Sequence, residues 1–397
     1  MKKRLLSILL ALCMVLCLVP TTAFAESETE ETPVCACETA CTAEAMNADC
    51  PICGVEGALP ENCECSEPIE NAEPEGEENE EQPEGEMSDP QPEAALTALI
   101  GGSETVTEVR TADELTAAIA DSAVNTVKLA ADISISSSLT VTRTVTLDLN
   151  GHVLKYESAN KGSVIVVEGS GNLTLTDSNT TAVHKFTPNT NGLWALDEAS
   201  GTETVTGGVI TGGTGYPFPL SITVNCGGGV YIAPGGQLTM TGGNIIGCSA
   251  EFGGGVCIYP RQNGEQIQFS MSGGSIIGCV ASNSGGGVYA SGKFQMSGQA
   301  VIRSCTVEST DQLIQGGGVY VDGSFEMSGE ATIKGCQAIS TFAYGGGVHV
   351  NSSRSFVMSE KAKIENCQAI SNSSRGRGNG GGVYLANNTK FTLSGSA

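Results

Sequence analysis

The chain has 397 residues and a formal net charge of −25, with 44 acidic against 19 basic side chains. This balance excludes a nucleic-acid-binding protein, because such a protein must present positive charge to phosphates. Half of the acidic residues, 22 of the 44, lie in residues 26–95, where Lys and Arg are absent. The acidity is therefore concentrated near the N-terminus.

Residues 1–25 have the pattern of a secretory signal. Residues 2–4 are basic, residues 5–19 are apolar, and residues 23–25 have the sequence Ala-Phe-Ala. The apolar run is too short to span a bilayer. We therefore expect cleavage before Glu26, a secreted or cell-surface protein, and no transmembrane helix in the mature chain.

Residues 26–66 form a cysteine-rich module with almost no apolar core. Its cysteines are Cys35, Cys37, Cys41, Cys50, Cys53, Cys63 and Cys65. Export favours disulfides, with the seventh thiol unpaired or bridged to another molecule. The alternative is a zinc site at Cys50 and Cys53 with Cys63 and Cys65, or with Cys35 and Cys37 in place of the latter pair. A disordered segment is the third possibility, and no other cofactor is expected. The segment resembles a short module that precedes surface proteins of Gram-positive gut bacteria.

Residues 67–106 are dominated by Glu and Pro, as in the run EPEGEENEEQPEGE that starts at Glu73. Such a run repels itself and has almost nothing to bury. We expect an acidic, disordered linker.

The folded part is expected over residues 107–397. Thr111 and Glu114 have the spacing of a capping box at the start of a short helix. One face of this helix is apolar, with Leu115, Ala118 and Ile119. The following segments alternate apolar and polar residues between Gly, Asn and Ser, which predicts short strands.

A Gly-Gly-Gly-Val motif recurs from Gly227 to Gly380 at steps of 26, 32, 31, 29 and 35 residues. Each repeat contains a GGGVYV strand, an F-x-M-S-G strand and an x-I-x-x-C strand. Such units stack, because none can bury its apolar face alone. Three strands and three bends per repeat predict an all-β solenoid, a parallel β-helix with one N-terminal capping helix. Repeat lengths differ mainly after the cysteine, so that bend should carry a variable loop.

Alignment of the repeats predicts columns of side chains in the core. One column contains Leu238, Phe269, Phe294, Phe325, Phe356 and Phe391. The column beside it contains Met240, Met271, Met296, Met327, Met358 and Leu393.

A third column consists of the cysteines Cys248, Cys279, Cys305, Cys336 and Cys367. In-register parallel strands separate Cβ atoms by about 4.8 Å, more than a disulfide prefers. We therefore expect a ladder of buried thiols, with isolated disulfides as the alternative. Cys226 and Cys257 lie off this ladder, and Cys257 takes an outward position that is tyrosine in other repeats. It should therefore be open to a thiol reagent unless Cys226 bridges it.

The helix sequence TADELTAAI, the stretch VTLDLNGHVL at residues 145–154 and the coils together cover about three quarters of the chain. They resemble the right-handed parallel β-helix of the pectin-lyase-like fold, and more closely the repeat surface proteins of Gram-positive gut bacteria. The resemblance implies the fold, but the fold hosts lyases, hydrolases, adhesins and stalks.

Lyases of this fold use an acidic calcium cluster with an Arg or Lys base, and the hydrolases use neighbouring aspartates with His-Gly and Arg-x-Lys signatures. The sequence has no Asp-Asp, His-Gly or Arg-Ile-Lys. Asp148 and His152 should cap a bend, and His184 and His349 have no evident partner. These features favour a non-catalytic surface or cell-wall β-helix protein, an adhesin or display stalk. A polysaccharide-active lyase or hydrolase with a degenerate or unrecognised site is the alternative.

Four tyrosines share one outward position of the coil: Tyr231, Tyr289, Tyr320 and Tyr384. Cys257 and His349 fill the gaps in this column. Rings on a strand face can stack on sugars, which makes a polysaccharide, or a host or cell-wall glycan, the candidate partner. In the alternative interpretation the column covers the sheet by cross-strand contact.

The chain ends with FTLSGSA at residues 391–397, which matches FEMSGEA at residues 325–331. It stops before the third strand of its coil. We expect a sequence truncated in mid-coil.

Overall fold

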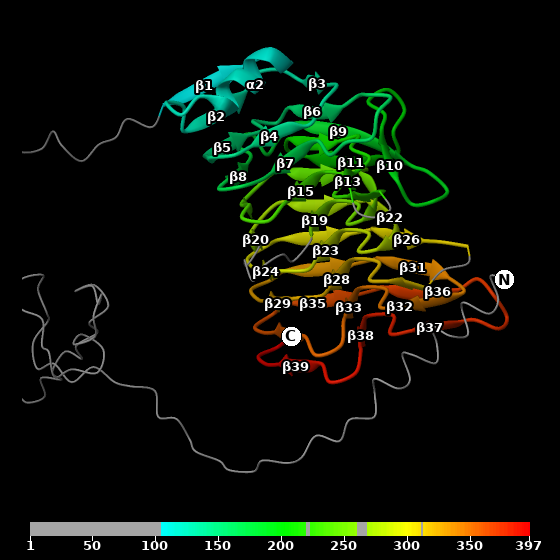
Figure 1. The fold of residues 1–397 in the computed structure, drawn as a ribbon. Helices are drawn as coiled ribbons and strands as arrows, with labels where there is room; N and C mark the ends of the chain where they lie inside the picture. Colours follow the sequence, from blue (N-terminus) through cyan, green and yellow to red (C-terminus); the bar gives the residue numbers. More distant parts are fainter. Residues whose placement is uncertain (1–104, 220–222, 260–267, 311–312) are drawn as a thin grey trace, which may run out of the picture. The chain divides into compact units, whose positions relative to one another are not determined.

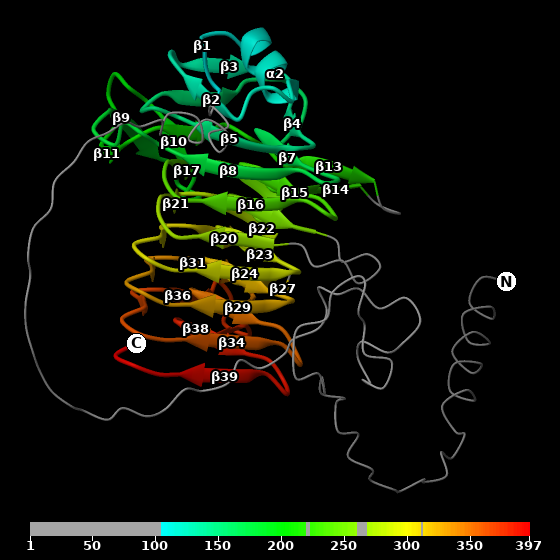
Figure 2. The same ribbon diagram turned by 90° about the vertical axis from the view of Figure 1, so that its left-hand side faces the viewer.

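The computed structural model describes residues 105–219, 223–259, 268–310 and 313–397 (Figure 1). The expected signal, the cysteine-rich module and the linker up to residue 104 lie outside the described residues. The described residues form a right-handed parallel β-helix, as the sequence predicted. Successive coils stack along one axis, so that strands of consecutive repeats lie side by side (Figures 1 and 2).

Three parallel sheets enclose the main core. Sheet 1 contains β1 (Val106–Val109), β2 (Thr126–Leu129), β5 (Thr144–Asp148), β8 (Asn172–Thr176), β16 (Gln237–Met240), β20 (Gln268–Met271), β24 (Lys293–Met296), β29 (Ser324–Met327), β34 (Ser355–Met358) and β39 (Lys390–Leu393). Sheet 2 contains β3 (Ile133–Ile135), β6 (Val153–Tyr156), β12 (Val209–Thr211), β17 (Asn244–Ile246), β21 (Ser275–Ile277), β25 (Val301–Arg303), β30 (Thr332–Lys334) and β35 (Lys363–Glu365). Sheet 4 contains β4 (Leu139–Val141), β7 (Ile165–Val167), β15 (Val230–Ile232), β19 (Val256–Ile258), β23 (Val288–Ala290), β28 (Val319–Val321), β33 (Val348–Val350) and β38 (Val383–Leu385).

The predicted core columns are confirmed as far as Phe356 and Met358, whereas Phe391 and Leu393 continue the register on β39 but are 37% and 55% exposed. Phe294, Phe325 and Phe356 are register partners on neighbouring strands, and their ring centroids are 4.8 Å apart. The methionine column runs beside them, for example from Met296 to Met327. The ring spacing equals the usual distance between paired strands, so the strand register itself sets the stacking.

The predicted N-terminal helix is α2 (Ala112–Ala120). The Thr111 side chain accepts a hydrogen bond from the Glu114 amide, as the capping box predicted. Leu115, Ala118 and Ile119 are buried in the main core. The helix lies at the N-terminal end of the stacked coils and covers their apolar interior (Figure 1).

The segment after each cysteine differs from the expected variable loop, because it forms strands of its own. Sheet 3 contains β13 (Tyr216–Pro219), β14 (Thr223–Cys226), β18 (Ser249–Phe252), β22 (Val280–Ser284), β26 (Thr306–Glu308), β31 (Gln337–Ser340) and β36 (Gln368–Ser371). A second row beside it contains β27 (Leu313–Gln315), β32 (Phe342–Tyr344) and β37 (Arg377–Asn379). Small apolar side chains between the two rows, such as Val307, Ala338 and Ala343, form a separate core. We call residues 306–310, 313–315, 337–344 and 368–379 the outer lobe.

A small antiparallel sheet is inserted between β8 and β12. It consists of β9 (Val183–Pro188), β10 (Trp194–Leu196) and β11 (Glu203–Thr206). Trp194 attaches this sheet to the coils, because its amide donates to the Gly278 carbonyl and the Arg303 guanidinium lies 4.8 Å from its ring centroid.

The residue before each ladder cysteine has a positive φ. The position holds Gly247, Gly278, Ser304, Gly335 and Asn366, with φ between 53° and 61°. Glycine adopts this conformation without steric cost, and Asn does so more readily than most residues. This bend directs the chain from sheet 2 into sheet 3.

Candidate functional site

The tyrosine column forms on the outer side of sheet 4 in the predicted register. Tyr231 pairs with Cys257, Cys257 with Tyr289, and Tyr289 with Tyr320. The column continues through His349 to Tyr384. Alternation along each strand accounts for this, because the flanking valines point into the core.

For most of its length the column is covered, which agrees with the interpretation that it supports the sheet by cross-strand contact. Relative exposure is 2% for Tyr231, 8% for Tyr289 and 7% for Tyr320, whereas Tyr384 is partly exposed. Aromatic side chains of other segments cover the column: Tyr216 stacks on Tyr231, and Phe252 and Tyr259 meet Tyr289 edge-on. Burial raises the pKa of Tyr320 to about 12 and raises the pKa of Tyr289 further.

Cys257 is also covered, contrary to the expectation that it would be exposed. It is fully buried, and so is Cys226. Both thiols belong to the same apolar cluster as Tyr231 and Tyr289. The outward direction of a side chain therefore does not make it accessible here, because a second layer packs over sheet 4.

The column reaches the surface at a groove between sheet 4 and the outer lobe. The groove has a volume of about 290 Å³. Its lining residues are Leu313, Gln315, Tyr344, His349, Asn351, Ser352, Tyr384, Ala386 and Asn387. None of these side chains is acidic, lysine or arginine. We call this the neutral groove.

Two aromatic rings from different walls meet in the neutral groove. Tyr344 comes from β32 of the outer lobe and Tyr384 from β38 of sheet 4. Their ring centroids are 4.8 Å apart and their planes are inclined by 61°. Both side chains are partly exposed. An edge-to-face pair of this kind leaves part of each ring open to a ligand.

His349 is one of the residues that line the groove, and one of its ring nitrogens is buried without a hydrogen-bond partner among the described residues. Its ring lies between Tyr320 and Tyr384, at centroid distances of 5.2 and 5.1 Å, and its exposure is 1%. Burial lowers the pKa of His349 to about 4, so the ring is neutral at physiological pH. The Gln315 amide nitrogen lies 3.3 Å from Nε2 and can only donate, which places the ring proton on Nδ1. Within the described residues Nδ1 has no hydrogen-bond partner.

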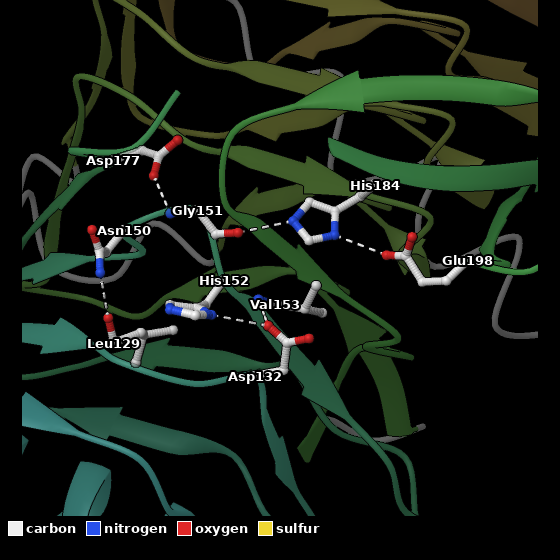
Figure 3. A network of polar contacts seen from close by, with 9 residues as sticks. All are labelled: Leu129, Asp132, Asn150, Gly151, His152, Val153, Asp177, His184 and Glu198. Atoms are coloured by element: carbon white, nitrogen blue, oxygen red, sulfur yellow. Dashed lines mark hydrogen bonds and ion pairs between the residues drawn. The ribbon is translucent and has the colours of Figure 1, made fainter. Parts of the chain in front are cut away.

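The acidic and histidine residues near the LDLNGH stretch hold turns. The Asp148 carboxylate accepts from the amides of Asn150 and Ser178, at 2.9 and 2.8 Å, which confirms its capping role. His152 Nδ1 lies 3.2 Å from Asp132 Oδ1 (Figure 3). The sequence did not reveal a role for Asp177, whose two oxygens accept from the amides of Gly151 and Gly208.

His184 has partners that the sequence did not reveal. Nδ1 lies 2.8 Å from Glu198 Oε1, and Nε2 lies 2.9 Å from the Gly151 carbonyl oxygen (Figure 3). Both neighbours are hydrogen-bond acceptors. This histidine attaches the inserted sheet to the turn after β5, and its nitrogens are not directed at a cavity.

The cysteine ladder consists of free thiols, as predicted. Cys248, Cys279, Cys305 and Cys336 have 0% exposure, and Cys367 is partly exposed. Burial raises the pKa of Cys248 and of Cys305. No group of three or more His, Cys, Asp or Glu in the described ranges could hold a metal ion. The four cysteines of the alternative zinc site lie outside those ranges.

Comparison with known proteins shows a similarity to one family of domains. Residues 106–209 match the family model of the pectate lyase-like adhesive domain. No curated protein and no solved structure matches the chain. In the described residues, no helix is long and apolar enough to cross a membrane. The matched segment runs from β1 to β12 and contains the capping helix, the first coils and the turn network of Figure 3, so this part of the β-helix is similar to an adhesive domain.

Proposed function

We propose that the protein is an exported, non-catalytic adhesive β-helix protein that binds glycans through the neutral groove. Similarity of residues 106–209 to an adhesive domain supports the adhesive role. The signal-like residues 1–25 support export. The glycan specificity rests on the neutral groove alone, because the matched segment does not include it.

The observation that carries the proposal is a groove with an uncharged lining that contains two partly exposed aromatic rings and a histidine whose buried Nδ1 has no acceptor among the described residues. A sugar ring has an apolar face of C–H groups and a rim of hydroxyl groups. Tyr344 and Tyr384 offer ring surface to that face. His349 Nδ1–H, in the absence of a ligand, is a buried donor without an acceptor, and a sugar hydroxyl would satisfy it.

Of the four predicted tyrosines, only Tyr384 takes part in this proposal as a direct contact. Tyr231, Tyr289 and Tyr320 are covered, and we assign them to support of the groove from within. The neutral groove lacks a carboxylate or a thiol among its lining residues, and His349 Nε2 already faces Gln315. This lining does not favour the alternative of a lyase or hydrolase at this site.

A glycan array tests the proposal. The wild-type chain should bind a subset of neutral glycans, and Tyr344→Ala and Tyr384→Ala should each reduce that signal by at least about tenfold, the effect of losing one good ring contact. His349→Phe keeps a stacked ring but removes the donor, and should weaken binding less. Phe342→Ala is the matched control, because Phe342 lies on the same strand as Tyr344, is 40% exposed and does not line the groove.

Two results would contradict the proposal. One is a wild-type chain that binds no glycan on the array. The other is a glycan signal that Tyr344→Ala and Tyr384→Ala leave unchanged while circular dichroism shows folded variants.

A further inference from the structure

A second groove lies on the other side of the turns that border the neutral groove. It crosses the connections between sheet 4 and sheet 1 in four successive coils and has a volume of about 590 Å³. Its lining residues are Gly292, Lys293, Gly323, Ser324, Glu326, Ser353, Arg354, Ser355, Asn388 and Lys390. We call this the cationic groove.

Positive charge is in excess in the cationic groove. Three of its lining side chains are cationic, Lys293, Arg354 and Lys390, against the single carboxylate of Glu326. Lys293 Nζ lies 3.7 Å from Glu326, which is close enough for a weak ion pair. Lys390 has no ion pair within the described residues.

The arginine of the groove is held in place by its neighbours. Arg354 Nε lies 3.0 Å from Asp322 Oδ1. The side-chain nitrogen Nδ2 of Asn351 donates to the same oxygen, also at 3.0 Å. Only Nε of the guanidinium makes this contact. The two terminal nitrogens therefore keep donors for a ligand, because guanidinium has five N–H groups.

The three cations lie on a regular scaffold. Lys293, Ser324, Ser355 and Lys390 occupy one register position on four successive strands. At the usual strand spacing the backbones of Lys293 and Lys390 are about 14 Å apart. Arg354 precedes Ser355 and lies between them along the axis. Serine hydroxyls line the space between the charges.

The two grooves share the same two turns. In the first turn, Ser352 lines the neutral groove and Ser353 lines the cationic groove. In the second turn, Asn387 lines the neutral groove and Asn388 lines the cationic groove. The Ser353 amide donates to the Asn387 carbonyl at 3.0 Å, so the two turns are stacked. A glycan chain bound in the neutral groove can therefore extend over one turn into the cationic groove.

We propose that the cationic groove binds sulfate or phosphate esters on the same glycan. This inference rests on the proposed function, because it extends the ligand of the neutral groove. Ionised oxygens form stronger hydrogen bonds with Lys and Arg than neutral hydroxyls do. An ester presents three terminal oxygens in a tetrahedron, which suits cations that approach from three different coils. A carboxylate presents two oxygens in one plane and would engage fewer of them.

The experiment compares four probes of matched size: neutral dextran, and carboxymethyl dextran, dextran sulfate and phosphorylated dextran at one charge density. The full chain should bind both esters more tightly than carboxymethyl dextran, and carboxymethyl dextran more tightly than dextran. The preference should shrink as the salt concentration rises from 50 to 500 mM, because salt screens exposed charges. Comparison of the two esters identifies which anion the groove prefers.

The test variant is Lys293→Gln with Lys390→Gln. It should lose at least about tenfold in affinity for the esters, the effect of removing one or two charge-assisted hydrogen bonds. The matched control is Lys361→Gln with Lys363→Gln, which removes the same charge outside the groove and should bind as the wild-type chain does. Lys361 is 70% exposed and its ion pair with Glu330 spans 3.3 Å.

Equal binding of esters and dextran would overturn the proposal, as would equal losses in the test and control variants. Equal binding of carboxymethyl dextran and the esters would overturn the assignment to a tetrahedral anion. These failures are distinct from failure of the proposed function. A neutral-glycan signal on the array that Tyr384→Ala removes, together with esters that bind no better than dextran, would keep the neutral groove while removing the cationic one.

Discussion

The ring of Tyr289 stacks on the ring of Tyr320, with centroids 4.9 Å apart and planes inclined by only 16°. Each ring therefore presents its face to the other and not to solvent. Together with the contacts of Phe252 and Tyr259 to Tyr289, this makes the middle of the tyrosine column part of the packing between layers. Only the end of the column, at Tyr384, has ring surface for a ligand.

Substitutions in the middle and at the end of the tyrosine column should separate the effect on stability from the effect on glycan binding. Tyr289→Ala should lower the free energy of unfolding by about 3 kcal/mol, because it leaves a cavity in a buried cluster. Tyr384→Ala should lower it by about 1 kcal/mol, since that ring is partly exposed. Urea denaturation measures both values. The assignment would be wrong if Tyr289→Ala were as stable as the wild-type chain, or if Tyr384→Ala were the more damaging of the two.

His349 should make the fold sensitive to acid. Burial lowers its pKa to about 4 in the folded state, whereas an unfolded histidine titrates near about 6.5. Between these values the unfolded chain binds the proton and the folded chain does not, so stability falls as the pH falls through this window. From pH 7.5 to 4.5 the loss from this residue should be about 2.5 kcal/mol.

The matched variant for this prediction is His349→Phe, which keeps a ring in the stack but cannot titrate. Carboxylates titrate in the same range in both proteins, so the difference between the two pH profiles reports His349 alone. Identical profiles in urea denaturation at pH 7.5 and 4.5 would show that the ring is not held neutral by burial.

The cysteine ladder should resist modification in the folded protein. Cys248, Cys279, Cys305 and Cys336 are fully buried, so a bulky maleimide should label them only after denaturation. Cys367 is partly exposed and should react first. Peptide mass mapping at successive times gives the order. Fast native labelling of Cys279 would argue against a ladder packed inside the coils.

Cys257 provides a second check in the same experiment. It should be as protected as Cys279, because aromatic residues of the outer layer cover it. Labelling of Cys257 ahead of Cys367 would indicate that this layer is not in place over sheet 4.

Gly278 should be needed for attachment of the inserted sheet. A Cβ atom at Gly278 would lie 2.1 Å from the Trp194 ring, and the φ of Gly278 is +53°. Gly278→Ala should therefore displace Trp194 and cost more than the roughly 1–2 kcal/mol of a left-handed alanine. Trp194 is the only tryptophan of the chain, so its fluorescence emission should shift to the red.

Gly335→Ala is the control for this substitution. Gly335 occupies the same coil position with a φ of +61°, and the nearest atom to its added Cβ is 3.9 Å away. Gly335→Ala should lower the free energy of unfolding only by the cost of a left-handed alanine, and it should leave the Trp194 fluorescence unchanged. Equal losses of stability in the two variants would mean that the contact with Trp194 contributes little.

Much of the fold could be predicted from the sequence because the coils repeat. Side chains alternate with a period of two within each strand, and the strands of successive repeats recur at similar distances along the chain. These two regularities align Phe325 with Phe356 and Cys305 with Cys336 independently of loop length. The helix at residues 112–120 was predictable for a local reason, since Thr111 and Glu114 are close enough in the chain to cap its first turn.

The sequence by itself thus determined the coil, its register, the residues of the core and the outward direction of the tyrosine column. The tertiary structure alone decided which outward residues are covered. Tyr289 and Cys257 are buried by other segments, whose position cannot be predicted from the alternation of apolar and polar residues. Tyr344 contacts Tyr384 only because the outer lobe folds back beside sheet 4. Alternation specifies the side of a strand on which a residue lies, but burial depends on what packs against that side, and this is set by contacts between residues far apart in the chain.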